Sequence, residues 1–194
     1  MKTGIEHSIL TVSASGEFDG IVKRALKPGT FMSVEFQKSG SNARRHILER
    51  FVDIVVINAP LPDEPGSELA LDITEKCSAS VLLVVPKDSY QETLEKVNDR
   101  GILLVAKPFP RGRIDRALSF LTAFQDRLRG LEKELQSTRE KLDEIRIISK
   151  AKLLLIEKKH LSEDEAHRFI GKAAMNDGIS RARAAERIME DLLD

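Results

Sequence analysis

Five short apolar runs alternate with polar, amphipathic stretches between the start of the chain and Pro110. The later runs are almost continuous in Val, Ile and Leu, which is typical of strands buried on both faces of a sheet. Strands that alternate with helices in this way predict parallel βαβ units and hence a doubly wound α/β sheet. Ser41 and Asp88 are the expected N-caps of the second and fourth helices. The predicted strands cover residues 9–12, 31–36, 53–57, 81–85 and 102–106, and the predicted helices cover residues 17–26, 41–50, 66–77 and 89–99.

The pattern changes over residues 113–148, where apolar side chains recur at alternating spacings of three and four. That spacing is typical of the seam of a left-handed coiled coil, so we predict a linker helix that forms a homodimer. The alternative is a single amphipathic helix packed on its own domain. We favour the intermolecular seam because both flanking segments have the patterning to fold separately. The expected seam consists of Leu121, Leu128, Leu135 and Leu142, with Phe124, Leu131, Thr138 and Ile145 between them.

The remaining residues, 149–194, predict a small helical domain in which the linker helix continues and two further helices follow. Ser162 and Glu165 have the spacing of a capping box, which predicts the start of the second helix. Gly178 is suited to end that helix in a left-handed conformation, and Ser180 is the expected cap of the third. The domains predicted from the sequence are therefore residues 1–112, 113–148 and 149–194.

Composition narrows the class of protein. The chain has 194 residues, with 31 basic and 31 acidic side chains and one cysteine, Cys77. A net charge of zero argues against a broadly basic nucleic-acid binder but leaves room for a local basic face. A single cysteine excludes a disulfide framework, and no apolar run is long enough to span a bilayer. Because the N-terminus also lacks a signal-peptide core, we expect a cytoplasmic protein without a membrane partner.

The first domain resembles the receiver domain of bacterial response regulators, a flavodoxin-like fold with a five-stranded parallel sheet. Lys107-Pro108-Phe109 after the fifth strand carries the resemblance, together with residues 51–58 and the loop at residues 61–66. A working receiver accepts a phosphoryl group on an aspartate at the end of the third strand. It also binds Mg²⁺ through that aspartate and an acidic pair after the first strand, because this cation prefers charged oxygen ligands.

Most of that chemistry is missing from this sequence. The phosphoacceptor position is Asn58, whose amide cannot form an acyl phosphate. The resemblance therefore implies a pseudo-receiver that is not phosphorylated by the usual route and that instead binds a regulatory protein or ligand. Lys107 is retained, and we interpret it as a surface lysine rather than an anion ligand. The degenerate pocket comprises Ser13 and Ala14 at the acidic-pair positions, Val85 at the hydroxyl position, Leu104 at the aromatic position and Lys107.

No pattern in the sequence favours an enzyme. The four histidines are scattered without the spacing of a metal site or an acid–base pair, and no glycine-rich phosphate loop is present. Asp63-Glu64 lies in a proline-rich loop and is interpreted as a solvated turn. We therefore expect no catalytic residues, no metal and no cofactor.

The C-terminal domain resembles the ANTAR domain, an RNA-binding three-helix module of bacterial transcription antiterminators. Residues 151–152, 161–166, 169–175 and 185–188 carry the resemblance, with departures at Leu153 and Gly171. An aromatic side chain that stacks on bases is not expected, because Phe169 is interpreted as a core residue. The candidate RNA-contacting residues are Lys152 and Lys172, followed by Ala151, Arg168 and Arg183.

The resemblance implies a regulator that binds stem-loops in a nascent leader transcript and so prevents formation of a terminator hairpin. Two alternatives stay open. A DNA-binding response regulator would use a recognition helix carrying Arg181, Arg183 and Arg187. A dimerisation adaptor would bind no nucleic acid.

Overall fold

The computed structural model describes residues 7–26 and 31–193. The chain divides into two compact units, with the boundary between Leu128 and Arg129. In the first unit, five parallel strands form one sheet in the order β2-β1-β3-β4-β5. The sequence-based prediction of a parallel five-stranded α/β sheet is therefore confirmed. The strands are β1 (His7–Val12), β2 (Phe31–Gln37), β3 (Ile54–Asn58), β4 (Ser80–Pro86) and β5 (Ile102–Lys107).

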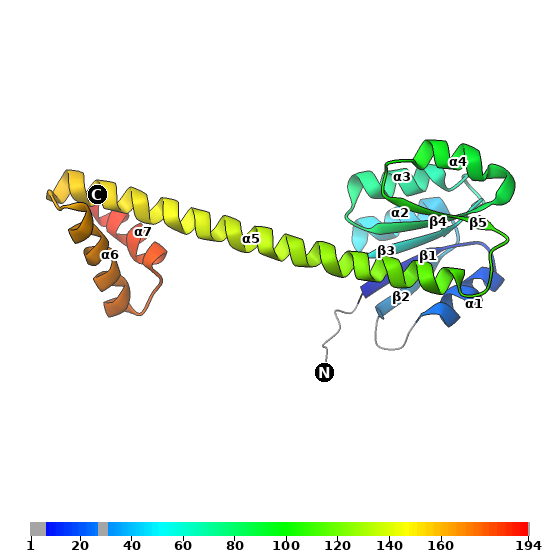
Figure 1. Ribbon diagram of the computed structural model, residues 1–194, viewed down its shortest axis with the longest axis horizontal. Coiled ribbons are helices and arrows are strands. Elements are labelled where there is room, and N and C mark those ends of the chain that lie inside the picture. The colour runs from blue at the N-terminus through cyan, green and yellow to red at the C-terminus, as the bar shows by residue number, and fades with distance from the viewer. Residues whose placement is uncertain (1–6, 27–30, 194) are drawn as a thin grey trace. The chain divides into compact units, whose positions relative to one another are not determined.

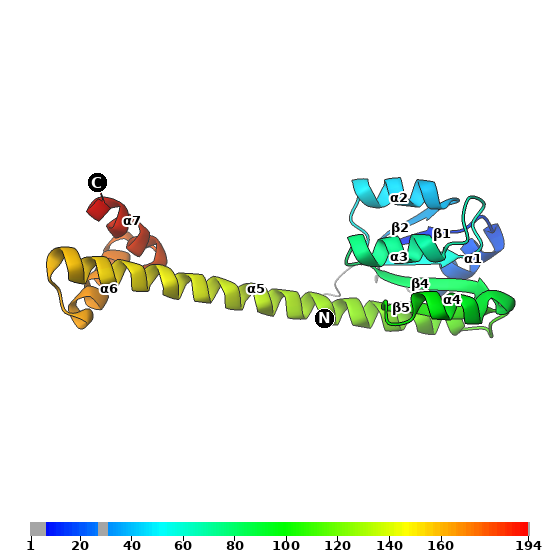
Figure 2. The same cartoon turned by 90° about the horizontal axis from the view of Figure 1, so that it is seen from above.

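Helices cover both faces of this sheet, which explains the unbroken apolar runs at residues 54–57 of β3 and 81–85 of β4. Figure 1 shows α3 and α4 on one side of the sheet, with α1 and the first turns of α5 on the other, and Figure 2 gives the view from above. Val55 and Ile57 point to the α2–α4 side, whereas Ile54 and Val56 point to the α1–α5 side. The helices of this unit are α1 (Gly16–Ala25), α2 (Gly40–Glu49), α3 (Ser67–Lys76), α4 (Tyr90–Val97) and the start of α5 (Arg113–Lys159).

Two helix starts differ from the sequence-based prediction. The N-cap of α2 is Ser39, whose hydroxyl accepts from the Asn42 N–H, and not Ser41. Ser41 instead lies in the first turn, where its N–H and hydroxyl donate to Asp63. A short 3₁₀ turn, Lys87–Ser89, precedes α4, so Asp88 lies within that turn and is not the cap.

Helix α5 also differs from the predicted linker, because its first four turns pack on the sheet. Ile114, Leu118 and Leu121 are buried on the face that α1 also covers. Leu121 is only 3% exposed and therefore belongs to the core of the first unit, not to a seam open to a partner. The physical reason is that residues 113–128 carry an apolar stripe directed at the sheet, in addition to the stripe that continues along the helix.

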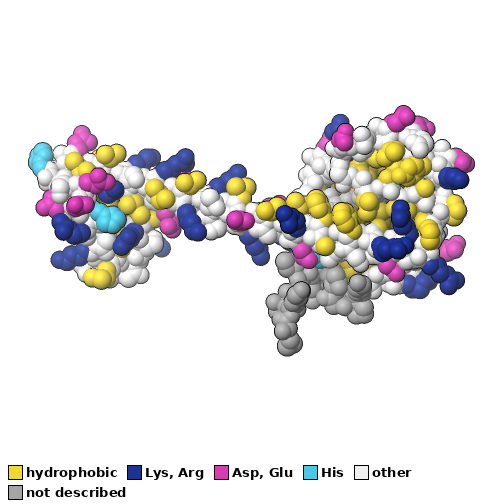
Figure 3. All heavy atoms as spheres, in the orientation of Figure 1, with side chains coloured by type: hydrophobic (Ala, Val, Ile, Leu, Met, Phe, Trp, Pro, Cys, Tyr) yellow, Lys and Arg dark blue, Asp and Glu magenta, His cyan; other side chains and the backbone are white. Residues whose placement is uncertain are grey.

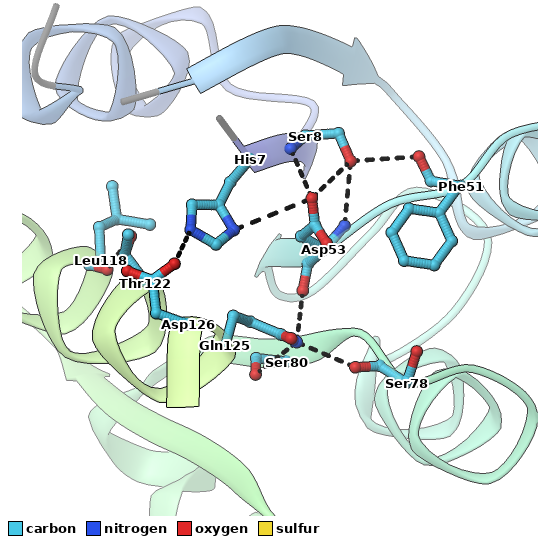
Figure 4. A network of polar contacts seen from close by, with 10 residues as sticks. All are labelled: His7, Ser8, Phe51, Asp53, Ser78, Ser80, Leu118, Thr122, Gln125 and Asp126. Carbon is cyan, nitrogen blue, oxygen red and sulfur yellow. Dashed lines mark hydrogen bonds and ion pairs between the residues drawn. The ribbon is translucent and has the colours of Figure 1, made fainter. Parts of the chain in front are cut away.

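A buried polar cluster secures α5 at the amino ends of the strands (Figure 4). The Gln125 side-chain amide donates to the backbone carbonyls of Asp53 and Ser78, each at 2.9 Å, and to the Ser80 hydroxyl at 3.0 Å. Next to it, His7 Nε2 lies 3.0 Å from Asp126 Oδ1. One turn of α5 is thereby held to three strand starts.

The second unit contains the rest of α5 with α6 (Glu163–Asp177) and α7 (Arg181–Leu193). Its core is small and rich in alanine. The predicted capping box is confirmed, since Ser162 and Glu165 bond reciprocally, and Gly178 ends α6 with a φ of 63°. The Ser180 hydroxyl accepts from the Arg183 N–H, which confirms it as a cap. The fully buried side chains of this core include Ala151, Leu155, Ala166, Ile170 and Ala185.

Candidate nucleic-acid interface

The carboxyl ends of the strands in the first unit carry a polar chain centred on Asn58. The Asn58 amide donates to the Ser13 hydroxyl at 3.0 Å and accepts from the Lys107 ammonium at 2.9 Å. Lys107 also donates to the Ala59 carbonyl at 2.6 Å, and burial lowers the pKa of its ammonium below the usual value. Lys107 is therefore a half-buried hydrogen-bond donor to Asn58. The interpretation of Lys107 as a surface lysine is corrected.

The other candidate positions of this pocket offer no charged oxygen. Ser13 is buried, Ala14 is exposed, and Val85 is buried against the α2–α4 side of the sheet, where Leu104 also packs. An open cleft of about 740 Å³ lies beside Asn58 and Lys107. Among the described residues, no group of three or more His, Cys, Asp or Glu side chains is arranged to hold a metal ion.

Asp63 and Glu64, interpreted from the sequence as a solvated turn, have defined partners. Asp63 accepts from the N–H groups of Ser41 and Gly40, and these bonds lower the pKa of its carboxyl to about 2. Glu64 pairs with Arg44 on α2. Together they fasten the loop after β3 to the start of α2, so these carboxylates serve structure and not catalysis.

In the second unit, the basic side chains predicted to contact RNA are not equivalent. Arg168 and Lys172 lie one turn apart on α6, and both are exposed. Arg183 is exposed near the start of α7. Lys152 is half-buried, and its ammonium lies 2.7 Å from Glu163 Oε1, which lowers the pKa of the Glu163 carboxyl. Lys152 must therefore exchange a carboxylate for a phosphate if it contacts RNA.

Two sequence-based assignments in this unit need correction. Ala151 has no exposed surface, because its methyl group packs in the core between the helices, so it supports the fold without offering surface to RNA. Phe169 was interpreted as core but is 41% exposed, with the Lys159 ammonium 5.0 Å from the centre of its ring. Periodicity places Ala166, Ile170 and Ala174 inward, and Phe169 lies at the edge of that face.

Helix α5 presents an exposed apolar stripe. Figure 3 shows yellow side chains spaced along the helix among charged ones. At 3.6 residues per turn, this stripe lies about a quarter turn from the face that packs on the sheet. It includes Phe120, which sequence analysis missed, and the rings of Phe120 and Phe124 stack with centroids 6.4 Å apart. The exposed members are Phe120, Phe124, Leu131, Leu135, Leu142 and Ile145.

Comparison with known families identifies the second unit. The family model of the ANTAR domain matches residues 136–189. This region is an ANTAR domain. The chain is also 27% identical over 141 residues to the transcriptional regulatory protein PdtaR of Mycobacterium tuberculosis, a match that covers 72% of this chain and 68% of the relative.

The first unit resembles solved receiver domains. The signal receiver domain of an HD domain-containing protein from Pseudomonas fluorescens Pf-5 aligns with a TM-score of 0.58 at 22% identity, over 67% of this chain and 97% of that one. Chemotaxis response regulator CheY4 of Vibrio cholerae aligns with a TM-score of 0.52 at 16% identity, over 60% of this chain and 99% of that one. At these identities the likeness establishes the fold alone.

The chain therefore joins a receiver-like domain to an ANTAR domain and is related to PdtaR. The matched relative is a transcriptional regulatory protein, which agrees with the expectation that the present chain is not an enzyme. None of the described helices has the length and apolar character that a membrane span requires.

Proposed function

We propose that this protein is a dimeric, RNA-binding transcription antitermination regulator that acts in the cytoplasm. Its ANTAR domain binds stem-loops of a nascent leader transcript, and holding one hairpin prevents the terminator hairpin from forming. Such control is a shift between mutually exclusive RNA folds, driven by differential binding. It requires no covalent catalysis by the protein.

The observation that carries this proposal is the paired exposure of Arg168 and Lys172 on α6. The opposite face of the same helix, formed by Ala166, Ile170 and Ala174, is buried in the core. The two cations are therefore held outward on a rigid helix, where they can meet successive phosphates. Arg183, on the exposed surface of α7, extends the set of cations to a second helix of the same unit.

The ion pair between Lys152 and Glu163 adds a fourth cation at the start of α6. Its 2.7 Å contact is exposed on the Glu163 side, whose side chain is 73% accessible. A phosphate can replace the carboxylate at little cost, because exposed ion pairs contribute only about 0–1 kcal/mol. The Lys152 ammonium thus contacts a phosphate of the transcript when the RNA binds.

Dimerisation through the exposed stripe of α5 links two ANTAR domains. Leu135, Leu142 and Ile145 are each more than half exposed, a costly arrangement for a free helix. A second copy of α5 would cover them. Linking two binding modules makes the second stem-loop contact intramolecular and raises its effective concentration.

The receiver-like domain is proposed to act without phosphorylation. Asn58 occupies the acceptor position, and its amide is already engaged by Ser13 and Lys107. The input is instead a regulatory protein or a ligand bound at the cleft beside these residues.

Gel-shift titrations of the full chain against RNA carrying two stem-loops, and against duplex DNA, test the proposal. We expect the protein to bind RNA more tightly than duplex DNA. Lys172→Glu and Arg168→Glu should each weaken RNA binding and reduce the slope of log K against log salt concentration by about one. Lys133→Glu, an exposed charge reversal on α5 within the coiled-coil region, is the matched control and should bind like the wild type. A preference for duplex DNA would favour a DNA-binding regulator, and binding to neither would favour an adaptor.

A further inference from the structure

Phe169 is a large aromatic side chain that the ANTAR domain leaves at its surface. It is 41% exposed, although its neighbour Ile170 is buried. The Lys159 ammonium from the end of α5 lies 5.0 Å from the centre of the ring. Three residues further along α6, Lys172 lies on adjoining surface. A flat ring is thus presented next to two cations.

A groove of about 480 Å³ opens beside this ring, between α6 and α7. Ala173, Ala184 and Ile188 give it an apolar lining. Its charged rim is balanced, because Lys159 and Arg187 are offset by the carboxylates of Asp177 and Asp191. Arg187 Nη1 already lies 3.3 Å from Asp177 Oδ2.

The lining of the groove favours a base of the RNA over a phosphate. The groove has no net positive charge to attract a phosphate, because its two cations are matched by two carboxylates. A neutral, planar heterocycle with N–H donors fits, because the ring and the apolar lining can stack on its faces while a carboxylate accepts from its edge. Guanine, adenine and cytosine each carry such donors.

We propose that Phe169 and the adjoining groove bind one unpaired base of the stem-loop RNA, with Asp191 accepting from the edge of that base. This site deepens the proposed RNA-binding function and rests on it. Lys159 moves off the ring when the base stacks and pairs with a phosphate next to it. Phosphate contacts by Arg168 and Lys172 supply affinity, whereas the Phe169 site supplies selectivity for an unpaired nucleotide.

The test compares ring variants of the full chain in titrations with the two-stem-loop RNA. Phe169→Ala should weaken binding by about 5- to 150-fold, the range expected for loss of one stacked base. Phe169→Leu keeps an apolar side chain without the flat ring and should lose affinity as well, whereas Phe169→Tyr should bind close to the wild type. Met175→Ala is the matched control, because Met175 is an exposed apolar residue of the same helix that does not line the groove.

RNA with single abasic sites in the loops locates the base. One abasic position should weaken binding of the wild type but have no further effect on Phe169→Ala, the signature of a coupled pair. At that position, Asp191→Asn should alter the preference among the four bases.

The outcomes separate this inference from the function on which it rests. Failure of the wild type to bind any RNA would overturn both. Tight binding by the wild type with equal affinity for Phe169→Ala and Phe169→Leu would overturn the base site alone. Circular dichroism melting of each variant shows whether the helices remain folded, and the Leu variant guards against a loss caused by unfolding.

Discussion

Lys107 and Asn58 form a direct hydrogen bond of 2.9 Å at the carboxyl ends of β5 and β3. The Asn58 amide uses its other end to donate to Ser13, so both polar atoms of the side chain have partners. Because the Asn58 amide is neutral, it carries no negative charge that a metal ion would have to balance. Asn58 therefore lacks the negative charge through which a carboxylate at this position would attract Mg²⁺.

We expect Asn58→Asp to fold but to remain unphosphorylated. Its carboxylate would pair with the Lys107 ammonium, while Ser13 and Ala14 still offer no charged oxygen for Mg²⁺. Incubation with acetyl phosphate and Mg²⁺, followed by intact mass spectrometry, checks this expectation. Ala14→Asp combined with Asn58→Asp is the informative companion, because it adds an acid near the pocket, and calorimetry should then detect Mg²⁺ binding. Phosphorylation of Asn58→Asp alone would contradict the proposed degeneracy.

Asp63→Asn should destabilise the first unit in a pH-dependent manner. Hydrogen bonds from Ser41 and Gly40 lower the pKa of the folded carboxyl to about 2, below its unfolded value of about 3.9. The stabilisation is therefore fully present above pH 4 and is lost as the pH falls through about 2. Urea midpoints of wild type and variant should differ at pH 7 and converge towards pH 2. Glu95→Gln, which removes an exposed carboxylate on α4, should follow the wild type throughout.

Leu121 and Leu135 should respond differently to substitution although both have the heptad spacing. Leu121→Ala removes a side chain that is 3% exposed in the core of the first unit, so we expect a loss of about 2–5 kcal/mol in unfolding free energy. Leu135→Lys changes a side chain that is 53% exposed and should instead lower the mass measured by light scattering. A monomeric wild type, or a dimer unchanged by Leu135→Lys, would count against the proposed seam.

Heptad spacing alone could not separate these two leucines. Over residues 114–125, α5 carries one apolar stripe directed at the sheet and another directed at solvent, and Leu121 belongs to the first while Phe120 belongs to the second. The heptad spacing in the sequence does not show which apolar residues of the helix face the sheet and which face solvent. The exact limits of a domain on a continuous helix depend on packing partners that are distant in sequence.

The strands were predictable for the opposite reason. Strand β4 is buried on both faces, so residues 81–85 form an unbroken apolar run, and that local signal can be identified without knowing the strand's partners. The cap of α2 was missed because Asp63, which occupies Ser41, lies 22 residues further along the chain. Phe169 was missed because its exposure depends on how α7 and the end of α5 pack around α6.

Gln125→Leu should loosen the attachment of α5 to the first unit. Its amide is buried and donates to the Ser78 carbonyl and the Ser80 hydroxyl, groups that leucine would leave without this donor. We expect a cost of about 1–3 kcal/mol, together with faster hydrogen exchange over residues 113–128. Gln136→Leu is the matched control on the same helix, because its amide is exposed and bonds only Glu140 among the described residues. Its effect should stay within about 0.5 kcal/mol. Equal exchange over residues 113–128 in both variants would show that apolar packing alone, through side chains such as Leu118, holds α5 on the sheet.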